Sequence, residues 1–162
     1  MRMLPWLLAA VIFLAAAPSP APAHDYKAGD IRIGHPWTRA TPPASRTGAG
    51  YMKLTNTGTA PDRLVGAASP IVGRAEIHAT EMDGTVMKMR QLADGLALPA
   101  GQTVELKPGG IHIMFPELSG PIEKGKRIPV TLVFEKAGRV DVDMEIVAIG
   151  GREPAAAPEH HH

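Results

Sequence analysis

The sequence predicts an all-β fold, a β-sandwich of the Greek-key kind, and three observations support that prediction. The 162 residues include 17 glycines and 16 prolines, which favour many turns. Short segments that alternate apolar and polar residues recur between those turns, and no long amphipathic helix interrupts them. The alternation is clearest at 128–134 and 140–148, which the turn Ala137-Gly138 separates. About eight short strands with frequent turns are typical of a β-sandwich.

The expected strands follow one another along the chain. Each combines alternating residues with a turn at its end, and they lie at 31–33, 50–55, 63–68, 74–82, 85–90, 104–106, 111–115, 128–134 and 140–148. We expect the first strand to stop at His35-Pro36-Trp37, because proline removes a ladder donor. We expect 24–29 to be loose and 92–99 to be a connection with room for a turn of helix.

Composition limits the possible functions. With 44% hydrophobic and 20% charged residues, the chain suits one soluble globular domain. The formal net charge of +1 gives no reason to expect nucleic acid or an anionic membrane surface as a partner. The sequence has no cysteine, which excludes a disulfide scaffold, thiolate metal ligands, thiol catalysis and a blue-copper centre. No Ser/His/Asp array or phosphate-binding loop is recognisable, so we expect no enzyme.

The N-terminal residues 1–23 have the pattern of a secretory signal peptide. Arg2 precedes an apolar run at 3–17, and Ala21-Pro22-Ala23 matches an A-x-A cleavage site. The run is shorter than the roughly 20 residues that a membrane span needs. We therefore expect cleavage, export to a bacterial periplasm and no membrane insertion of the mature chain. No cysteine follows the run to carry a lipid anchor. The mature chain then comprises a β-sandwich domain at 24–149 and a flexible, histidine-containing tail at 150–162.

The stretch 74–114 concentrates the residues that can bind a metal. It holds two of the seven histidines and four of the eight methionines, namely His78, Met82, Met87, Met89, His112 and Met114. Asp83-Gly84 between two expected strands is a strong hairpin signal, because a type I′ turn needs positive φ at both central residues. With this turn, His78 directly opposes Met89, and their Cβ atoms lie about 5 Å apart. His112 and Met114 are separated by one residue and share a strand face.

Two His/Met pairs on neighbouring strands predict a site with two nitrogen and two sulfur ligands. The odd-numbered residues of 111–115 are the better core residues, so His112 and Met114 are expected to point away from the main core. Met52 and Met144 instead share apolar strand faces and are expected inside it. The alternative is a pair of hydrogen-bonded histidines beside a methionine-lined interaction surface, which spacing does not exclude.

The softness of the ligands indicates which metal such a site would take. Thioether sulfur suits Cu(I), while zinc usually takes thiolate, imidazole or carboxylate ligands. Two imidazoles and two thioethers therefore predict a Cu(I) site that needs no redox-sensitive thiol.

The chain resembles the PCu(A)C-type periplasmic copper chaperones over about residues 24–147. The resemblance depends on His78, then ten residues, then Met89, and on His112-x-Met114. The surrounding sequence also matches, at Ala23-His24-Asp25-Tyr26, His35-Pro36-Trp37, Met87-Lys88-Met89-Arg90 and 106–114.

This resemblance implies a cupredoxin-like β-sandwich and a Cu(I) site made of His78, Met89, His112 and Met114. It also implies delivery of copper to the copper centre of a respiratory cytochrome c oxidase. The acceptor would be a copper subunit of that oxidase or another copper chaperone.

Two departures from the family pattern concern the sulfur ligands. Met89 and His112 are separated by 22 residues where the usual pattern has 21. Ala79-Thr80 stands where the family often has a methionine after the first histidine, and Met87 or Met82 is an auxiliary candidate for that sulfur.

We expect a copper carrier that works by ligand exchange. Bonds from thioethers are individually weak and neutral, which favours handover to a partner. Two alternatives remain: periplasmic copper sequestration for tolerance, and a metal-free structural β-sandwich.

The ends of the mature chain give a second candidate site, one that prefers Cu(II). Cleavage after Ala23 leaves His24 first, and its amine and imidazole can chelate one metal together. The tail adds three nitrogen donors at His160, His161 and His162. Nitrogen donors suit Cu(II). The alternative is a solvated tail with adventitious affinity.

Overall fold

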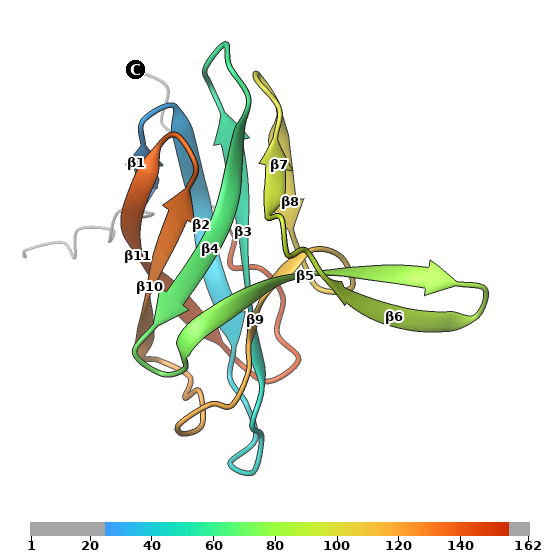
Figure 1. The fold of residues 1–162 in the computed structure, drawn as a ribbon. Helices are drawn as coiled ribbons and strands as arrows, with labels where there is room; N and C mark the ends of the chain where they lie inside the picture. Colours follow the sequence, from blue (N-terminus) through green and yellow to red (C-terminus); the bar gives the residue numbers. More distant parts are fainter. Residues whose placement is uncertain (1–24, 156–162) are drawn as a thin grey trace, which may run out of the picture.

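The computed structural model describes residues 25–155, which form a closed sheet with one hairpin that extends from its side (Figure 1). The expected signal peptide and the tail histidines lie outside the described residues and stay predictions. The described residues contain strands and no helix: β1 (Tyr26–Ala28), β2 (Ile31–Arg39), β3 (Gly48–Asn56), β4 (Asp62–Ser69), β5 (Gly73–Asp83), β6 (Val86–Gln91), β7 (Leu96–Leu98), β8 (Thr103–Leu106), β9 (His112–Phe115), β10 (Arg127–Phe134) and β11 (Gly138–Val147). Accordingly, residues 25–155 provide no helix that could cross a membrane.

Seven strands close into a ring. They follow the order β2-β11-β10-β4-β5-β9-β3, and pairing of β3 with β2 closes the sheet. β2 and β11 run parallel, and the other pairs in the ring are antiparallel. β1, β7 and β8 extend the sheet beside β2, β4 and β3, while β6 pairs with β5 alone. Strands distant in sequence therefore lie side by side, and the all-β prediction is confirmed.

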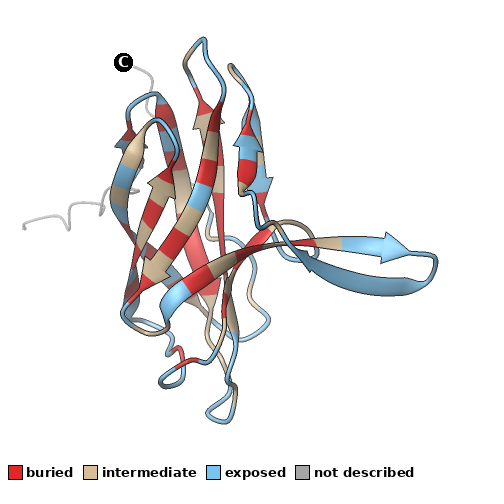
Figure 2. Cartoon of the chain, in the orientation of Figure 1, coloured by how far each residue is buried: buried red, intermediate tan, exposed pale blue. Residues whose placement is uncertain are grey.

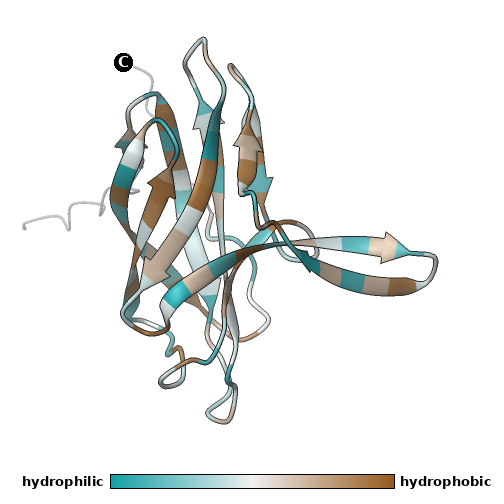
Figure 3. Ribbon diagram, viewed as in Figure 1, coloured by the Kyte–Doolittle hydropathy of each residue, from teal (hydrophilic) through white to brown (hydrophobic). Residues whose placement is uncertain are grey.

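The core fills the inside of the ring with alternate residues of its strands. Ile113 and Phe115 of β9 are fully buried, as are Leu132 of β10 and Leu54 of β3. The side chains of Met52 and Met144 are 1% and 0% exposed, which confirms their expected place in the core. Figure 2 shows buried residues as bands along the ring strands, and many of these bands are hydrophobic in Figure 3.

Three local predictions are wrong. The first long strand does not stop at His35-Pro36-Trp37, because β2 continues through a bulge between Gly34 and Trp37. His35 takes a φ of 48° there, and a bulge accommodates a proline that cannot donate to the ladder. The segment expected to be loose contains β1, and the connection at 92–99 contains β7 in place of a helical turn.

The β5–β6 hairpin leaves the ring and projects from it (Figures 1 and 2). The first part of β5 pairs with β4 and β9, and its last part pairs with β6. Every residue from 81 to 91 is exposed. The hairpin therefore joins a buried half of β5 to an exposed half, and it carries residues 81–91 away from the ring.

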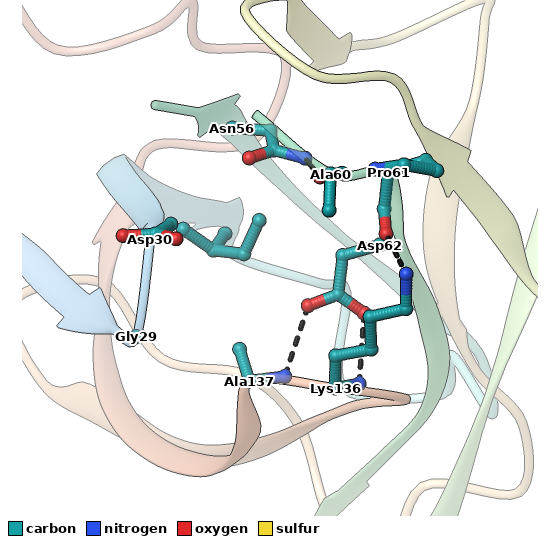
Figure 4. A pocket seen from close by; sticks show the side chains of 9 residues that line it. Gly29, Asp30, Asn56, Ala60, Pro61, Asp62, Lys136 and Ala137 are labelled. Carbon is teal, nitrogen blue, oxygen red and sulfur yellow. Dashed lines mark hydrogen bonds between the residues drawn. The ribbon is translucent and has the colours of Figure 1, made fainter. Parts of the chain in front are cut away.

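A carboxylate ties the start of β4 to the β10–β11 turn. Asp62 accepts hydrogen bonds from the backbone N–H groups of Arg63, Lys136 and Ala137 at 2.7, 2.9 and 2.9 Å. Figure 4 shows the two bonds from Lys136 and Ala137. Burial raises the pKa of Asp62, but these hydrogen bonds and the charge of Lys136 outweigh it and leave the pKa below its ordinary value.

We predict that Asp62→Asn lowers the free energy of unfolding by about 1–3 kcal/mol at neutral pH, because it removes hydrogen bonds to a charged group and leaves a partly buried backbone donor unpaired. Folding lowers the pKa of this carboxyl, so its contribution is present above the unfolded value of about 3.9 and is lost as the pH falls through the folded value. Urea unfolding should therefore show a larger difference between the two proteins at neutral pH than at strongly acidic pH. Asp30→Asn is the control, because Asp30 is a second carboxylate that lines a pocket together with Asp62 and Lys136. Equal losses for both variants would contradict the assignment.

Candidate metal site

The strand β5 presents two chemically different faces. Ala75, Ile77 and Ala79 are buried in the core, and Glu76 and His78 alternate with them on the other face. Because successive side chains in a strand point to opposite faces, the core residues determine where the histidine lies.

The pairing of β5 with β9 brings the two candidate histidines together. His78 directly opposes His112, and Glu76 directly opposes Met114. The centroids of the two imidazole rings are 5.9 Å apart, and the ring planes are inclined by 36°. His112 is 6% exposed and the His78 side chain 16%. The imidazole pair is thus largely enclosed where the hairpin meets the ring, and it is less open than a surface site would be.

Each imidazole has one nitrogen held by an oxygen acceptor. His78 Nε2 lies 2.8 Å from Glu76 Oε2, and His112 Nδ1 lies 3.0 Å from the Gly110 carbonyl oxygen. An ionised carboxylate and a carbonyl can only accept, so these nitrogens carry the hydrogen in the neutral rings. The second nitrogen of each ring, Nδ1 of His78 and Nε2 of His112, is then unprotonated. His78 Nδ1 is buried without a hydrogen-bond partner. Metal-binding histidines are typically held in this way, one ring N–H to a carboxylate or carbonyl.

The turn of the β5–β6 hairpin differs from the predicted one. Asp83 opposes Val86, so the two-residue loop is Gly84-Thr85 and the predicted Asp83-Gly84 turn is wrong. Gly84 has a φ of 64° and takes the first central position, where a type II′ turn places glycine.

This loop moves the cross-strand pairs by two residues. His78 opposes Gln91, and Met89 opposes Thr80, so the predicted direct pairing of His78 with Met89 is wrong. A shift of two residues keeps every side chain on its face. Met89 is therefore the diagonal neighbour of His78 on the same face, at a typical distance of about 7–8 Å.

Three of the four methionine candidates are more exposed than the histidines. Met89 is 59% exposed and Met114 is partly buried. Met82 and Met87 lie further out on the same face of the hairpin, at 64% and 62% exposure. The terminal candidates His24, His160, His161 and His162 lie outside the described residues.

Two groups at the site were not singled out in the sequence. Glu76 precedes His78 by two residues and therefore shares its face, a relation that strand periodicity contains. The Gly110 carbonyl accepts from both His112 Nδ1 and the Thr80 N–H, at 3.0 and 3.2 Å. No side-chain pattern could have indicated a backbone acceptor of this kind.

Nitrogen and carboxylate donors alone do not make up a complete ligand set at this position. Within residues 25–155, no group of three or more His, Cys, Asp or Glu side chains is arranged to hold a metal. Met89 of β6 and Met114 of β9 offer sulfur donors on the strand faces that carry the two imidazoles.

Solved structures with the same fold define the class of protein. A copper-bound PCuAC domain from PmoF2 is 33% identical, spans 77% of this chain and 98% of that domain, and superposes with a TM-score of 0.66. An apo PCuAC domain from PmoF1 is 32% identical, spans 77% of this chain and 99% of that domain, and superposes with a TM-score of 0.66. The CuI-DR1885 structure from Deinococcus radiodurans is 30% identical, spans 68% of this chain and 74% of that one, and superposes with a TM-score of 0.53. The chain is a PCuAC-type domain with an all-β, cupredoxin-like fold, and PCuAC domains are copper-binding domains of the chaperone type.

The chain belongs to the LpqE-like family. The family model described as "Putative lipoprotein LpqE-like" matches residues 31–146. A protein of Leifsonia xyli subsp. xyli whose name describes it as a lipoprotein is 31% identical over 134 residues, which cover 83% of this chain and 80% of that one. The resemblance and the fold expected from the sequence are thus confirmed.

We predict that the two histidines of the metal-free protein adopt opposite neutral tautomers, because their acceptors lie on different ring nitrogens. Long-range 1H–15N spectra at mildly alkaline pH should show the hydrogen on Nε2 of His78 and on Nδ1 of His112. Glu76→Gln should give a mixture of tautomers at His78 and leave His112 unchanged. A His78 ring with its hydrogen on Nδ1 would contradict this geometry.

Proposed function

We propose that this protein is a periplasmic copper carrier that binds Cu(I) through His78, Met89, His112 and Met114. It delivers the ion to the copper centre of a respiratory cytochrome c oxidase, either directly or through another copper chaperone. The single observation that carries the proposal is the imidazole pair, in which each ring has one nitrogen held by an oxygen and the other available. The copper-bound relatives support the same cargo.

The donor set suits Cu(I) in softness and in charge. Met114 stands two residues from His112 on one face, and Met89 is diagonal to His78 on that face. Thioethers prefer Cu(I) among the common biological metals. All four donors are neutral, and the Glu76 carboxylate beside His78 places one negative charge next to the ion. A partly buried charge needs such compensation.

The exposure of the donors suits transfer by ligand exchange. The imidazoles are largely buried and fixed by hydrogen bonds, while Met89 is 59% exposed. An acceptor ligand can therefore replace the sulfur of Met89 while both nitrogens still hold the ion. The carrier performs no bond-making reaction on a substrate, so we propose no enzymatic activity.

Export to the periplasm fits the relatives, one of which is named as a lipoprotein.

The competing function is sequestration of copper for tolerance, which would use the same site without a dedicated acceptor. A structural, metal-free role is the other alternative. Copper binding distinguishes the metal-free structural role from the two copper-binding functions. Transfer of copper to an acceptor distinguishes a carrier from a sequestration protein.

We also propose that the chain termini form a second, weaker site for Cu(II) from His24, His160, His161 and His162. The described ends of the chain support it, because both lie beside the paired residues Gly34 of β2 and Lys53 of β3. Glu153 Oε1 lies 3.2 Å from Lys53 Nζ. A Cβ placed on Gly34 would lie 3.7 Å from an oxygen of Asp25 and 3.9 Å from the Cβ of Lys53. Asp25 and Glu153, near the two described ends of the chain, thus lie on the same part of the sheet. The alternative is adventitious binding by the tail.

We predict that His78→Ala and His112→Ala each weaken Cu(I) binding by more than the roughly 10–100-fold typical of losing an outer-shell group. Anaerobic competition against a chromophoric Cu(I) ligand measures the affinity. Met52→Leu and Met144→Leu are the controls, because similar volume in the core leaves the site intact. Equal losses in all four variants would count against the assignment.

Delivery of copper to an acceptor is tested with the Cu(I)-loaded wild-type protein. Mixed with the soluble copper domain of a cytochrome c oxidase, it should lose its copper to that domain, as measured by separation and metal analysis. Tight binding without transfer to oxidase domains or to other copper chaperones would favour sequestration.

We predict that the Cu(II)-loaded mature protein gives a paramagnetic resonance spectrum of nitrogen donors. Deletion of 156–162, or one extra residue before His24, should change that spectrum and leave Cu(I) affinity unaltered. A spectrum unchanged in both variants would remove the terminal site.

A further inference from the structure

Three methionines gather on one face of the outer hairpin. Met82 directly opposes Met87, and Met89 follows Met87 by two residues on the same face. Their side chains are 64%, 62% and 59% exposed, which places them among the most exposed large hydrophobic residues described. Directly opposed residues have Cβ atoms about 4.5–5.5 Å apart, and the unbranched methionine side chain has three rotatable bonds. The three sulfurs can therefore converge on one point.

The fold does not need these side chains. Met52 and Met144 are buried and pack in the core, whereas every residue from 81 to 91 is exposed. A single exposed apolar residue is ordinary, but a cluster of three on one projecting face indicates a binding role.

The charges of the hairpin lie on its other face and are paired with one another. Lys88 contacts Asp83, and Arg90 donates to Glu81 at 2.7 Å. The methionine face carries no charged side chain along 79–91, since its remaining members there are Thr80 and Gln91. A cation that approaches this face meets neutral soft donors and no competing ammonium or carboxylate.

The same face leads directly to the imidazole pair. From the tip inward its residues are Met82 with Met87, then Thr80 with Met89, then His78, which opposes His112 in β9. Successive rungs on one face are two residues apart, about 6.8 Å along a strand. Met89 lies between the tip and the imidazoles. Its sulfur can therefore bind an ion together with Met82 and Met87, or together with His78 and His112.

We propose that Met82, Met87 and Met89 form a second Cu(I) site, a three-thioether loading site outside the His78–His112 pair. Cu(I) binds there first, keeps its oxidation state, and passes inward when the imidazoles replace the sulfurs of Met82 and Met87 while Met89 stays bound. Three thioethers without an imidazole or a nearby carboxylate hold the ion more weakly than the inner site. The inward step rests on the proposed function, while the outer site is defined by the hairpin alone.

The test is anaerobic Cu(I) titration of three variants in the presence of a weak or a strong chromophoric Cu(I) ligand. Against the weak ligand the wild type should bind two Cu(I) per chain, the inner ion with Met89 and the outer ion with Met82 and Met87 alone. Against the strong ligand it should bind one. Met82→Leu/Met87→Leu should bind one in both, with the strong-site affinity changed less than threefold. His78→Ala/His112→Ala should lose the strong site and keep the weak one. Val86→Leu alters an exposed apolar residue on the charged face and should match the wild type.

Loading kinetics provide a second measurement. Uptake into the strong site at limiting Cu(I) should be slower by at least tenfold in Met82→Leu/Met87→Leu than in Val86→Leu. Leucine preserves an apolar surface, so a patch that only docks a protein partner would leave both stoichiometry and rate unchanged.

The possible outcomes separate the two proposals. Two Cu(I) in Met82→Leu/Met87→Leu, or one in the wild type against the weak ligand, would overturn the outer site. Strong binding retained in His78→Ala/His112→Ala would overturn the proposed inner site and leave the outer one standing if the methionine variant still loses one ion.

Discussion

The pairing of β5 with β9 is the constraint on which the candidate site depends. Ile77 opposes Ile113 in the core, where they are 4% and 0% exposed. Burial of such a side chain is worth about 1.5–3 kcal/mol. Since side chains alternate with a period of two, burial of this pair brings His78 and His112 together on the other face. A slip of one residue would turn Glu76 and His78 into the core, so hydrophobic burial fixes the position of the imidazole pair.

Beyond His78 the same strand has a different physical character. Residues 81–91 are all exposed, so the hairpin depends on cross-strand pairs worth about 0.2–1 kcal/mol each and on two exposed ion pairs that solvent screens. Elements with so few buried contacts open at a low free-energy cost. Met89 therefore lies on an exposed element, while the imidazoles lie where β5 pairs with β9 in the ring. This division suits an ion that has to be both held and released.

The sequence predicted the faces of the hairpin more reliably than its register. Asp83-Gly84 and Gly84-Thr85 are both acceptable two-residue loops, and only the φ values distinguish a type I′ from a type II′ turn. A loop moved by one residue shifts the pairs by two, so Met89 stayed on the face of His78. The bulge at His35 and the short strand β7 depend on tertiary pairing, which alternation along a single strand does not contain. The role of Glu76 required the observed hydrogen bond, although its face followed from periodicity.

Charge balance gives the proposed inner site a second reason to hold Cu(I), independent of sulfur softness. The imidazoles and thioethers are neutral, and the Glu76 carboxylate that accepts from His78 is the one charged group hydrogen-bonded to the described imidazole pair. With a monovalent ion the site and its carboxylate sum to zero, whereas a divalent ion leaves one uncompensated positive charge. Such a charge is costly where His112 is only 6% exposed. The carboxylate thus compensates the single charge of Cu(I), and it does so through the same hydrogen bond that orients the ligand.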